Sequence, residues 1–440
     1  MKFLGLIVLL FLNSPNIFSG ELETILDLKQ VLKIAKANNP TLLLAKEKEN
    51  EIDAQKKLTT SYLFPSVSWS LNGNYQKDAV YTGTPKFSGD PYNLYTSDLK
   101  LSQTLFAYGS VSAIKQIEYQ KKIQVLSAEI QERTLTQNVI QSFYQFILYQ
   151  HSLENLLKTQ EIIQKSLSTA NERYRIGRGQ LLDVLQVKTQ LALLSPQIEN
   201  AKNQLETSAN QLTFYMGEKE RSKFKLKGSL KTLLLKNIQK HIDLKNFRLP
   251  EYEMNKLQLE AMEYTKDVTY AKDFPTVKLV GDYLYNNYKK SELFSDYSHA
   301  WAVQLQLNIP LFSGFSSQYE RQQLISQETQ LYHSKHDLED SLSLNQVTSL
   351  RNLQTAEASL DSAATAASLA EQSQNEAHRN YKLATIDFLQ FLTVEQAALQ
   401  AKTALDQLKY QSIIAYANYF MASGQSLSVL VDILSDEGMN

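Results

Sequence analysis

The residues that come closest to a chemical site are two histidines and two aspartates, His333, His336, Asp337 and Asp340. At helical spacing these four side chains share one surface, and imidazole and carboxylate groups are ligands for zinc. Polar residues on an exposed helix face are more often a hydrated surface than a metal site. We therefore expect no bound metal.

The rest of the chain offers no catalytic arrangement. It contains no cysteine, no nucleophile with a neighbouring base and no glycine-rich phosphate loop. Formal net charge is −1 and no basic stripe is present, so nucleic acid is not expected as a partner. These features predict a protein that is not an enzyme, binds no cofactor and acts through its architecture.

The first twenty residues have the pattern of a secretory signal peptide. Lys2 precedes an apolar run over residues 3–12, and small residues follow up to Gly20. The alternative is an amino-terminal membrane anchor, but the run is shorter than the ~20 residues that span a bilayer. No later stretch is long and apolar enough for a transmembrane helix.

Four short segments alternate between apolar and polar residues, which is typical of strands with one apolar and one polar face. The clearest case has Val67, Trp69 and Leu71 separated by serines. The glycine- and proline-containing stretch 77–96 is expected to be a loop. The strands are predicted at about 65–75, 98–106, 275–285 and 301–312.

The open edges of a four-stranded sheet raise the question of what covers them. Eleven residues is the length of a tilted membrane-spanning strand, but four strands cannot close a barrel and lipid does not tolerate an open edge. Either several chains each contribute four strands, or the strands form soluble hairpins covered by helices. The regular Ser/Asn face of the first strand favours the barrel.

Two long segments, 110–175 and 315–383, contain neither glycine nor proline. The first would make a helix of roughly 100 Å. Apolar residues recur every three or four positions among polar ones, which indicates a narrow stripe of the coiled-coil type. Two shorter helices, 26–61 with a break at Pro40 and 180–215, together match that length and would stack end to end beside the long helix.

The strand–helix pattern occurs twice in the chain. Phe64-Pro65 returns as Phe274-Pro275 at an offset of 210 residues (275 − 65), and the Leu-Phe turn at 105 returns at 311. A repeat of this length is half of one architecture rather than a solenoid unit. The expected segments are a signal peptide (1–20), a first repeat (21–216), an inter-repeat segment (217–248), a second repeat (249–420, ending in a helix over 387–420) and a tail (421–440).

Three motifs resemble the TolC family of outer membrane efflux and secretion channels: the opening stretch 26–40, the Leu-Phe turns and the helical tip 173–185. The resemblance covers essentially the whole mature chain. It implies a mixed α+β membrane protein that forms a homotrimer. Each chain would give four strands to a twelve-stranded β-barrel, which continues into a long α-helical periplasmic barrel with a small equatorial domain built from the inter-repeat segment and the tail.

The same resemblance implies a function. The protein would be a passive exit duct in the outer membrane of a Gram-negative bacterium, in contact with outer-membrane lipid and extending into the periplasm. It would serve a tripartite efflux or type I secretion system, with a periplasmic adaptor protein and an inner-membrane transporter of RND, ABC or MFS type. The alternative is a secreted coiled-coil structural or adhesive protein, which would not need the strand pattern twice.

The family closes its periplasmic aperture with aspartate and tyrosine residues near the helical tips. The matching positions here are Asp183 and Tyr381, while Gln390 and Thr393 stand where the family has two further acidic residues. Asp387 lies nearby but out of register. A cation-binding ring is therefore not expected, and the aspartates have the alternative role of stabilising helix N-termini.

The family's adaptor docks at the turns of the two helical hairpins. In this chain those turns are Ile176, Gly177 and Arg178 in the first repeat and Leu383, Ala384 and Thr385 in the second. A glycine where a helix ends also has a purely structural explanation, because it adopts the left-handed conformation that closes the helix.

Overall fold

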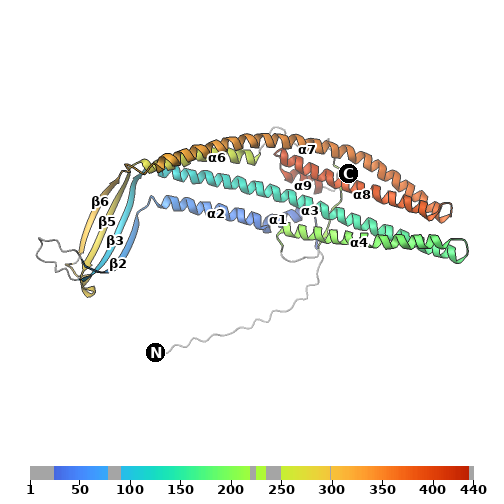
Figure 1. The fold of residues 1–440 in the computed structure, drawn as a ribbon, viewed down its shortest axis with the longest axis horizontal. Helices are drawn as coiled ribbons and strands as arrows, with labels where there is room; N and C mark the ends of the chain where they lie inside the picture. The colour runs from blue at the N-terminus through green and yellow to red at the C-terminus, as the bar shows by residue number, and fades with distance from the viewer. Residues whose placement is uncertain (1–23, 78–90, 219–223, 234–248, 298, 436–440) are drawn as a thin grey trace, which may run out of the picture.

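The computed structural model describes residues 24–77, 91–218, 224–233, 249–297 and 299–435. The molecule is elongated: a β-sheet forms one end, and long helices run from it to two helical hairpins at the other end (Figure 1). The signal peptide predicted over 1–20 lies outside the described residues.

The sheet combines the strands of both repeats. Its strands are β2 (Ser66–Gln76), β3 (Tyr92–Ala107), β5 (Thr276–Asn287) and β6 (His299–Asn308), in the order β2-β3-β5-β6 with every neighbouring pair antiparallel. The pairing of β3 with β5 joins the first repeat to the second. It leaves β2 and β6 as the two edges of the sheet within one chain.

Two predicted strand limits are wrong. Strand β3 begins at Tyr92 rather than about 98, because Tyr92–Thr96 pair with Asn72–Gln76 of β2 although the surrounding composition is that of a loop. Strand β6 ends at Asn308 rather than 312. Pro310 explains this early end, since proline has no N–H to donate to a neighbouring strand.

Each repeat contains one long helix with shorter helices beside it, three in the first repeat and two in the second (Figure 1). The long helices are α3 (Ser110–Arg175, 66 residues) and α7 (Ser316–Lys382, 67 residues). Near the sheet, each is flanked by a helix that leads into a strand, and towards the tip by the returning helix of its hairpin. The shorter helices are α1 (Leu28–Asn38), α2 (Pro40–Ser61), α4 (Leu181–Met216), α6 (Pro250–Tyr270) and α8 (Phe388–Ala422).

The break between α1 and α2 holds the end of α4 in place. Pro40 begins α2, and the Asn39 side chain accepts a hydrogen bond from the Thr41 N–H at 2.9 Å. The same buried side chain donates to the carbonyl of Tyr215 at 3.0 Å. Opposite it, a Cβ on Gly217 would lie 2.4 Å from the Asn38 carbonyl oxygen, so only glycine fits at the end of α4.

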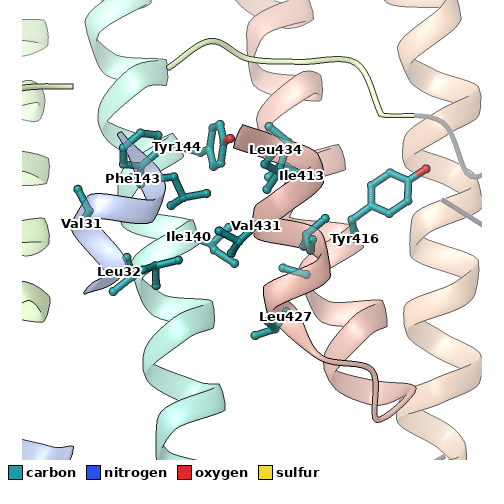
Figure 2. Packing of buried hydrophobic residues seen from close by; sticks show 14 of the residues in the cluster. Val31, Leu32, Ile140, Phe143, Tyr144, Ile413, Tyr416, Leu427, Val431 and Leu434 are labelled. Carbon is teal, nitrogen blue, oxygen red and sulfur yellow. The ribbon is translucent and has the colours of Figure 1, made fainter. Parts of the chain in front are cut away.

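The largest apolar core lies around the middle of the helical part. Residues of α1, α3 and α8 pack there against α9 (Leu427–Ser435), as Figure 2 shows for Val31, Phe143 and Tyr416. The sequence did not predict α9, nor the parallel pairing of β1 (Thr24–Leu26) with β4 (Phe224–Leu226). Residues 219–223, 234–248 and 436–440 of the two predicted equatorial segments lie outside the described residues.

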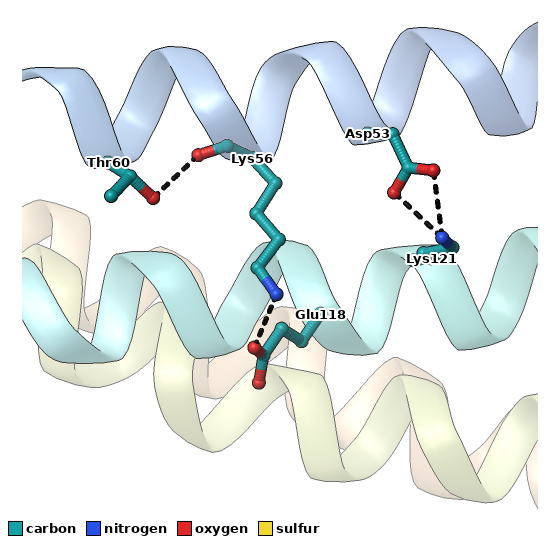
Figure 3. Close-up of polar contacts among 5 residues, drawn as sticks. All are labelled: Asp53, Lys56, Thr60, Glu118 and Lys121. Atoms are coloured by element: carbon teal, nitrogen blue, oxygen red, sulfur yellow. Dashed lines mark hydrogen bonds and ion pairs between the residues drawn. The ribbon is translucent and has the colours of Figure 1, made fainter.

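Ion pairs connect α2 to α3 near the sheet (Figure 3). The Lys56 ammonium lies 2.7 Å from Glu118, and the Lys121 ammonium bonds both carboxylate oxygens of Asp53 at 2.8 Å. The hydrogen bond from Lys56 holds the pKa of Glu118 below its usual value. These pairs are partly exposed, so they fix the register of the two helices more than they stabilise the fold.

Candidate functional site at the helical tips

The first tip is a turn closed by a left-handed glycine. Helix α3 ends at Arg175, and Gly177 has φ 73°. The Gly177 N–H donates to the Tyr174 carbonyl at 3.1 Å and the Arg178 N–H donates to the Arg173 carbonyl at 2.8 Å. This is the Schellman arrangement. A Cβ on Gly177 would meet no atom within 4 Å, so the turn is open to a partner.

The second tip has the same backbone with a different residue at its apex. Ala384 takes the left-handed conformation (φ 61°), and the Thr385 N–H donates to the Asn380 carbonyl at 3.0 Å. Leu383 is 73% exposed beside it. The two turns predicted for docking therefore have the same hydrogen-bond pattern. Both also present an exposed apolar side chain next to the apex.

The two tips are joined within one chain by Arg173 and Tyr381. The Arg173 guanidinium donates to the backbone carbonyl of Tyr381 at 2.6 Å and lies 5.0 Å from the centre of its ring. On its other side the Tyr381 ring stacks on Phe391, with ring centres 4.7 Å apart. A single arginine thus connects the end of α3 to the end of α7.

Asp183 and Tyr381, predicted from the family pattern, are brought near each other. Asp183 lies in the first turn of α4 and is half-buried. Burial raises the pKa of the Tyr381 hydroxyl, the Arg173 cation opposes that rise, and the Asp183 carboxylate adds to it. The tyrosine therefore stays protonated at neutral pH and remains a hydrogen-bond donor.

Asp387, Gln390 and Thr393 make hydrogen bonds within their own helix, α8. Asp387 is the N-cap of α8: its carboxylate accepts from the Gln390 N–H at 2.8 Å, and the Gln390 side chain accepts from the Asp387 N–H at 3.4 Å. The Thr393 hydroxyl donates to the Leu389 carbonyl. All three are exposed, and the structure gives Asp387 the capping role that the sequence left as an alternative.

Sequence reasoning missed a buried charge just above the second tip. Glu395 of α8 is 1% exposed; one carboxylate oxygen accepts from the Gln374 amide at 2.8 Å, and the other lies 2.9 Å from His378 Nε2. That second oxygen accepts no hydrogen bond within the described part of the chain. Burial raises the pKa of Glu395. The sequence does hold a signal for this buried charge, because Glu395 follows Phe388 and Phe391 on the apolar stripe of the same helix.

The His/Asp group considered first does not form a site. His336 contacts Glu339 rather than its aspartate neighbours, and no three His, Cys, Asp or Glu side chains converge within the described ranges. Among the helices that the structure describes, none is both long and apolar enough to cross a bilayer.

The sheet has two chemically different faces. Val67, Trp69 and Leu71 of β2 are each more than half exposed, and Val303, Leu305 and Leu307 of β6 are 61–69% exposed. The pairing register places them on one face with Leu99 and Tyr283 between them. The opposite face carries the serines and asparagines of β2. An apolar face left uncovered by this chain needs a partner or a lipid.

Comparison with known proteins agrees with this geometry. The family model described as "Outer membrane efflux protein" matches residues 31–218, from α1 to the end of α4. The chain carries an outer membrane efflux protein domain. Over residues 31–218 this match bears out the family predicted from the sequence, and its description names the outer membrane.

Solved structures share the fold of this chain over nearly its whole length. A membrane protein from Pseudomonas aeruginosa matches with TM-score 0.78 at 17% identity, over 90% of this chain and 92% of that chain. The CmeC outer membrane channel of Campylobacter jejuni gives 0.77 at 16%, over 93% and 89%. The open state of the MtrE outer membrane channel of Neisseria gonorrhoeae gives 0.73 at 14%, over 91% and 89%.

A relative by sequence is Protein CyaE of Bordetella pertussis. It is 24% identical over 306 residues, which cover 68% of this chain and 62% of that protein. The chain therefore spans less than two thirds of this relative's length in the alignment.

Proposed function

We propose that three copies of this chain form a passive exit duct through the outer membrane and periplasm. The observation that carries the proposal is the sheet: its edges β2 and β6 are unpaired within the chain, and one of its faces is apolar and exposed. Pairing β2 of one copy with β6 of the next removes every edge, which lipid requires. Three copies of four strands give twelve.

The apolar face supports contact with lipid. Trp69, Tyr283 and Trp301 fall in one row across the strands, as in the aromatic belts at the border of a membrane-spanning barrel. The polar face would line a water-filled lumen. The helices continue that lumen for roughly 100 Å, a length that suits passage across the periplasm.

Gating belongs to the tips in this proposal. Arg173 ties the two hairpins of a protomer together at Tyr381, with Asp183 beside the pair. Releasing this contact frees one hairpin to move relative to the other, and packed interfaces of this kind switch between discrete states. Energy for transport would come from an inner-membrane transporter of RND, ABC or MFS type, because the sequence contains no phosphate-binding loop for a nucleotide.

A periplasmic adaptor would dock at the exposed turns, 176–178 and 383–385. Both turns present a left-handed apex with an apolar neighbour, Ile176 and Leu383, which are 54% and 73% exposed. Exposed apolar side chains beside a rigid turn are the kind of anchor that a helical partner can bury.

The gate is tested by single-channel recording of purified protein in planar bilayers. Arg173→Ala should raise conductance several-fold, because the link to Tyr381 is lost. Asp183→Ala should raise it less. Arg379→Ala is the matched control, since Arg379 lies at the same tip but pairs only with Glu376 at the surface. Equal conductance in the arginine variants and the unmodified protein would reject the Arg173 gate.

Assembly and docking are tested separately. Native mass spectrometry in detergent should give a trimer, and cell fractionation should recover it in the outer membrane; a soluble monomer would instead favour the secreted structural protein. Because the chain has no cysteine, Ile176→Cys supplies a unique cross-linking site in the native host. A periplasmic protein should be captured from position 176, whereas Ala358→Cys, an exposed position on the shaft of α7, should capture none.

A further inference from the structure

The polar face of the sheet carries four charged residues among neutral ones. The register places Lys278 opposite Thr104 and Gln306, and it places Asp98, Lys100 and Asp282 in two adjacent rows further from the helices. The remaining positions on this face are small or uncharged, as the serines and asparagines of β2 illustrate. Charge is therefore concentrated at two levels of this face.

The level nearer the helices is positive. Lys278 is exposed and makes no ion pair within the described part of the chain. It stands two residues after the start of β5, close to the junction with α6. Each chain contributes one such ammonium group at this level.

The level nearer the outer end of the sheet is negative. The Lys100 ammonium lies 3.8 Å from the Asp282 carboxylate, so these two charges largely offset each other. Asp98 has no such partner: its Oδ1 is buried and receives no hydrogen bond from any described residue. One uncompensated negative charge per chain remains.

The radius of the barrel decides whether these charges act on a solute in the lumen. Twelve strands spaced about 4.8 Å apart and tilted by about 40° enclose a barrel of roughly 12 Å backbone radius. Inward side chains reduce the open radius to roughly 7 Å, which is shorter than the Debye length of about 8 Å at physiological salt. Lys278 and Asp282 are separated by about 13 Å along the strand. The two levels are thus distinct, and each acts across the whole lumen.

We propose that the polar face forms a two-level charge filter in the exit barrel, with three Lys278 on the periplasmic side and three Asp98 on the outer side. Small anions from outside meet the negative level, and small cations that pass it meet the positive level. The filter opposes inward entry of small ions of either sign. The inference rests on the proposed trimeric barrel, whose lumen it describes.

The test measures the local potential by cysteine modification, which the cysteine-free chain allows without background. Ser70→Cys reports on the outer level, since Ser70 pairs directly with Asp98, and Thr104→Cys reports on the inner level, opposite Lys278. Trimers in liposomes are treated from the outer side with methanethiosulfonates bearing trimethylammonium or sulfonate groups. The readout is the ratio of cationic to anionic modification rates.

Asp98→Asn should lower this ratio at position 70 by about 3–10-fold, and Lys278→Gln should raise it at position 104 by a similar factor, since such fields reach a few kT. Lys100→Gln should raise the ratio at position 70. All three effects should shrink in 1 M salt. Ratios that stay within two-fold of the parent at a reactive cysteine would overturn the filter.

Failure of the barrel itself gives a different result. Leu71→Cys lies on the apolar face and should be protected by lipid from these water-soluble reagents. If position 71 reacts as fast as position 70, or if position 70 does not react, the polar face is not a lumen and the proposed duct is wrong. The filter is rejected on its own only when position 70 reacts and position 71 does not.

Discussion

The two long helices, α3 and α7, have nearly the same length but end in different ways. Helix α3 begins after Gly109 (φ 85°) and ends before Gly177 (φ 73°), so both left-handed positions have the residue that adopts them without strain. Helix α7 begins after Phe315 (φ 65°) and ends before Ala384 (φ 61°). These are the non-glycine residues with positive φ in the described chain, and each costs about 1–2 kcal/mol.

The ion pairs between helices, in contrast, are the same in both repeats. Lys56 pairs with Glu118 between α2 and α3, and Lys266 pairs with Glu328 between α6 and α7, both at 2.7 Å. The two pairs are related by one offset of 210 residues (266 − 56 and 328 − 118). The repeats thus keep the contact that sets helix register and differ at the turns.

The largest expected difference concerns the turn that starts each long helix. A Cβ on Gly109 would lie 2.6 Å from the Ala271 Cβ, whereas a Cβ on Gly314 would meet nothing within 4 Å. Gly109→Ala should therefore lower the free energy of unfolding by about 2–4 kcal/mol, from crowding and left-handed strain together. Gly314→Ala carries the strain alone and should cost about 1 kcal/mol. Urea unfolding followed by circular dichroism measures both, and equal losses would show that the first turn has room to relax.

The second difference concerns the buried glutamate of the second hairpin. Position 395 of α8 corresponds to Lys188 of α4, which is exposed. Burial raises the folded-state pKa of Glu395 above its unfolded value, so the fold binds the proton more tightly and its stability falls as pH rises through the folded pKa.

Acidification from pH 7 towards pH 5 should accordingly raise the protection factors of amide exchange, corrected for the intrinsic rate at each pH, in the second hairpin and leave those of the first unchanged. Glu395→Gln should remove this pH dependence and raise the protection of the hairpin at pH 7, because the neutral amide buries no charge. Glu376→Gln, an exposed neighbour, is the control. A pH response that survives Glu395→Gln would assign it to another group.

The third prediction exchanges the residues of the two tips. Ala384→Gly should stabilise the second hairpin by about 1 kcal/mol through relief of left-handed strain, and Gly177→Ala should destabilise the first by a similar amount. Both positions are exposed, so packing should not obscure the effect. Hydrogen exchange at residues 173–178 and 379–385 provides the readout. Shifts of the same sign in both variants would contradict the assignment of strain to Ala384.

The smallest effect concerns the two equivalent ion pairs. Lys266 and Glu328 are 17% and 21% exposed, while Lys56 and Glu118 are both above 40%. Double-mutant cycles should give a coupling energy of about 1 kcal/mol for the first pair and about 0.3 kcal/mol for the second, because solvent screens exposed charges. Coupling that is larger at Lys56–Glu118 would mean that burial does not govern these contacts.

Much of the fold could be predicted from the sequence because its signals are local. The absence of glycine and proline marked residues 110–175 and 315–383, and the helices found there have nearly those bounds. Alternation marked four strands, with errors at Tyr92 and Asn308 where pairing or Pro310 overrode the composition. Helix α9 and the β1–β4 pair were missed, since a nine-residue helix and three-residue strands carry too little pattern.

The candidate site was harder to predict. The family pattern identified Asp183 and Tyr381 as positions, and in the structure the Asp183 carboxylate is near enough to raise the pKa of Tyr381. It did not identify Arg173 as the residue that links the tips, nor Glu395 as a buried charge. Both depend on contacts between residues about two hundred or twenty positions apart, and spacing along one helix does not encode them.

By itself, the sequence determined the periodic features: two repeats, the lengths of the helices, the two-faced strands and glycine at three of the four turns that bound the long helices. Each follows from backbone preferences and from side-chain period, which act over a few residues. Tertiary structure alone decided that β3 pairs with β5, that Arg173 reaches Tyr381, and that Asp98 lacks the partner that Asp282 has. These outcomes depend on which surfaces meet when distant segments pack, and the free energy of that packing is set by all the contacting residues together.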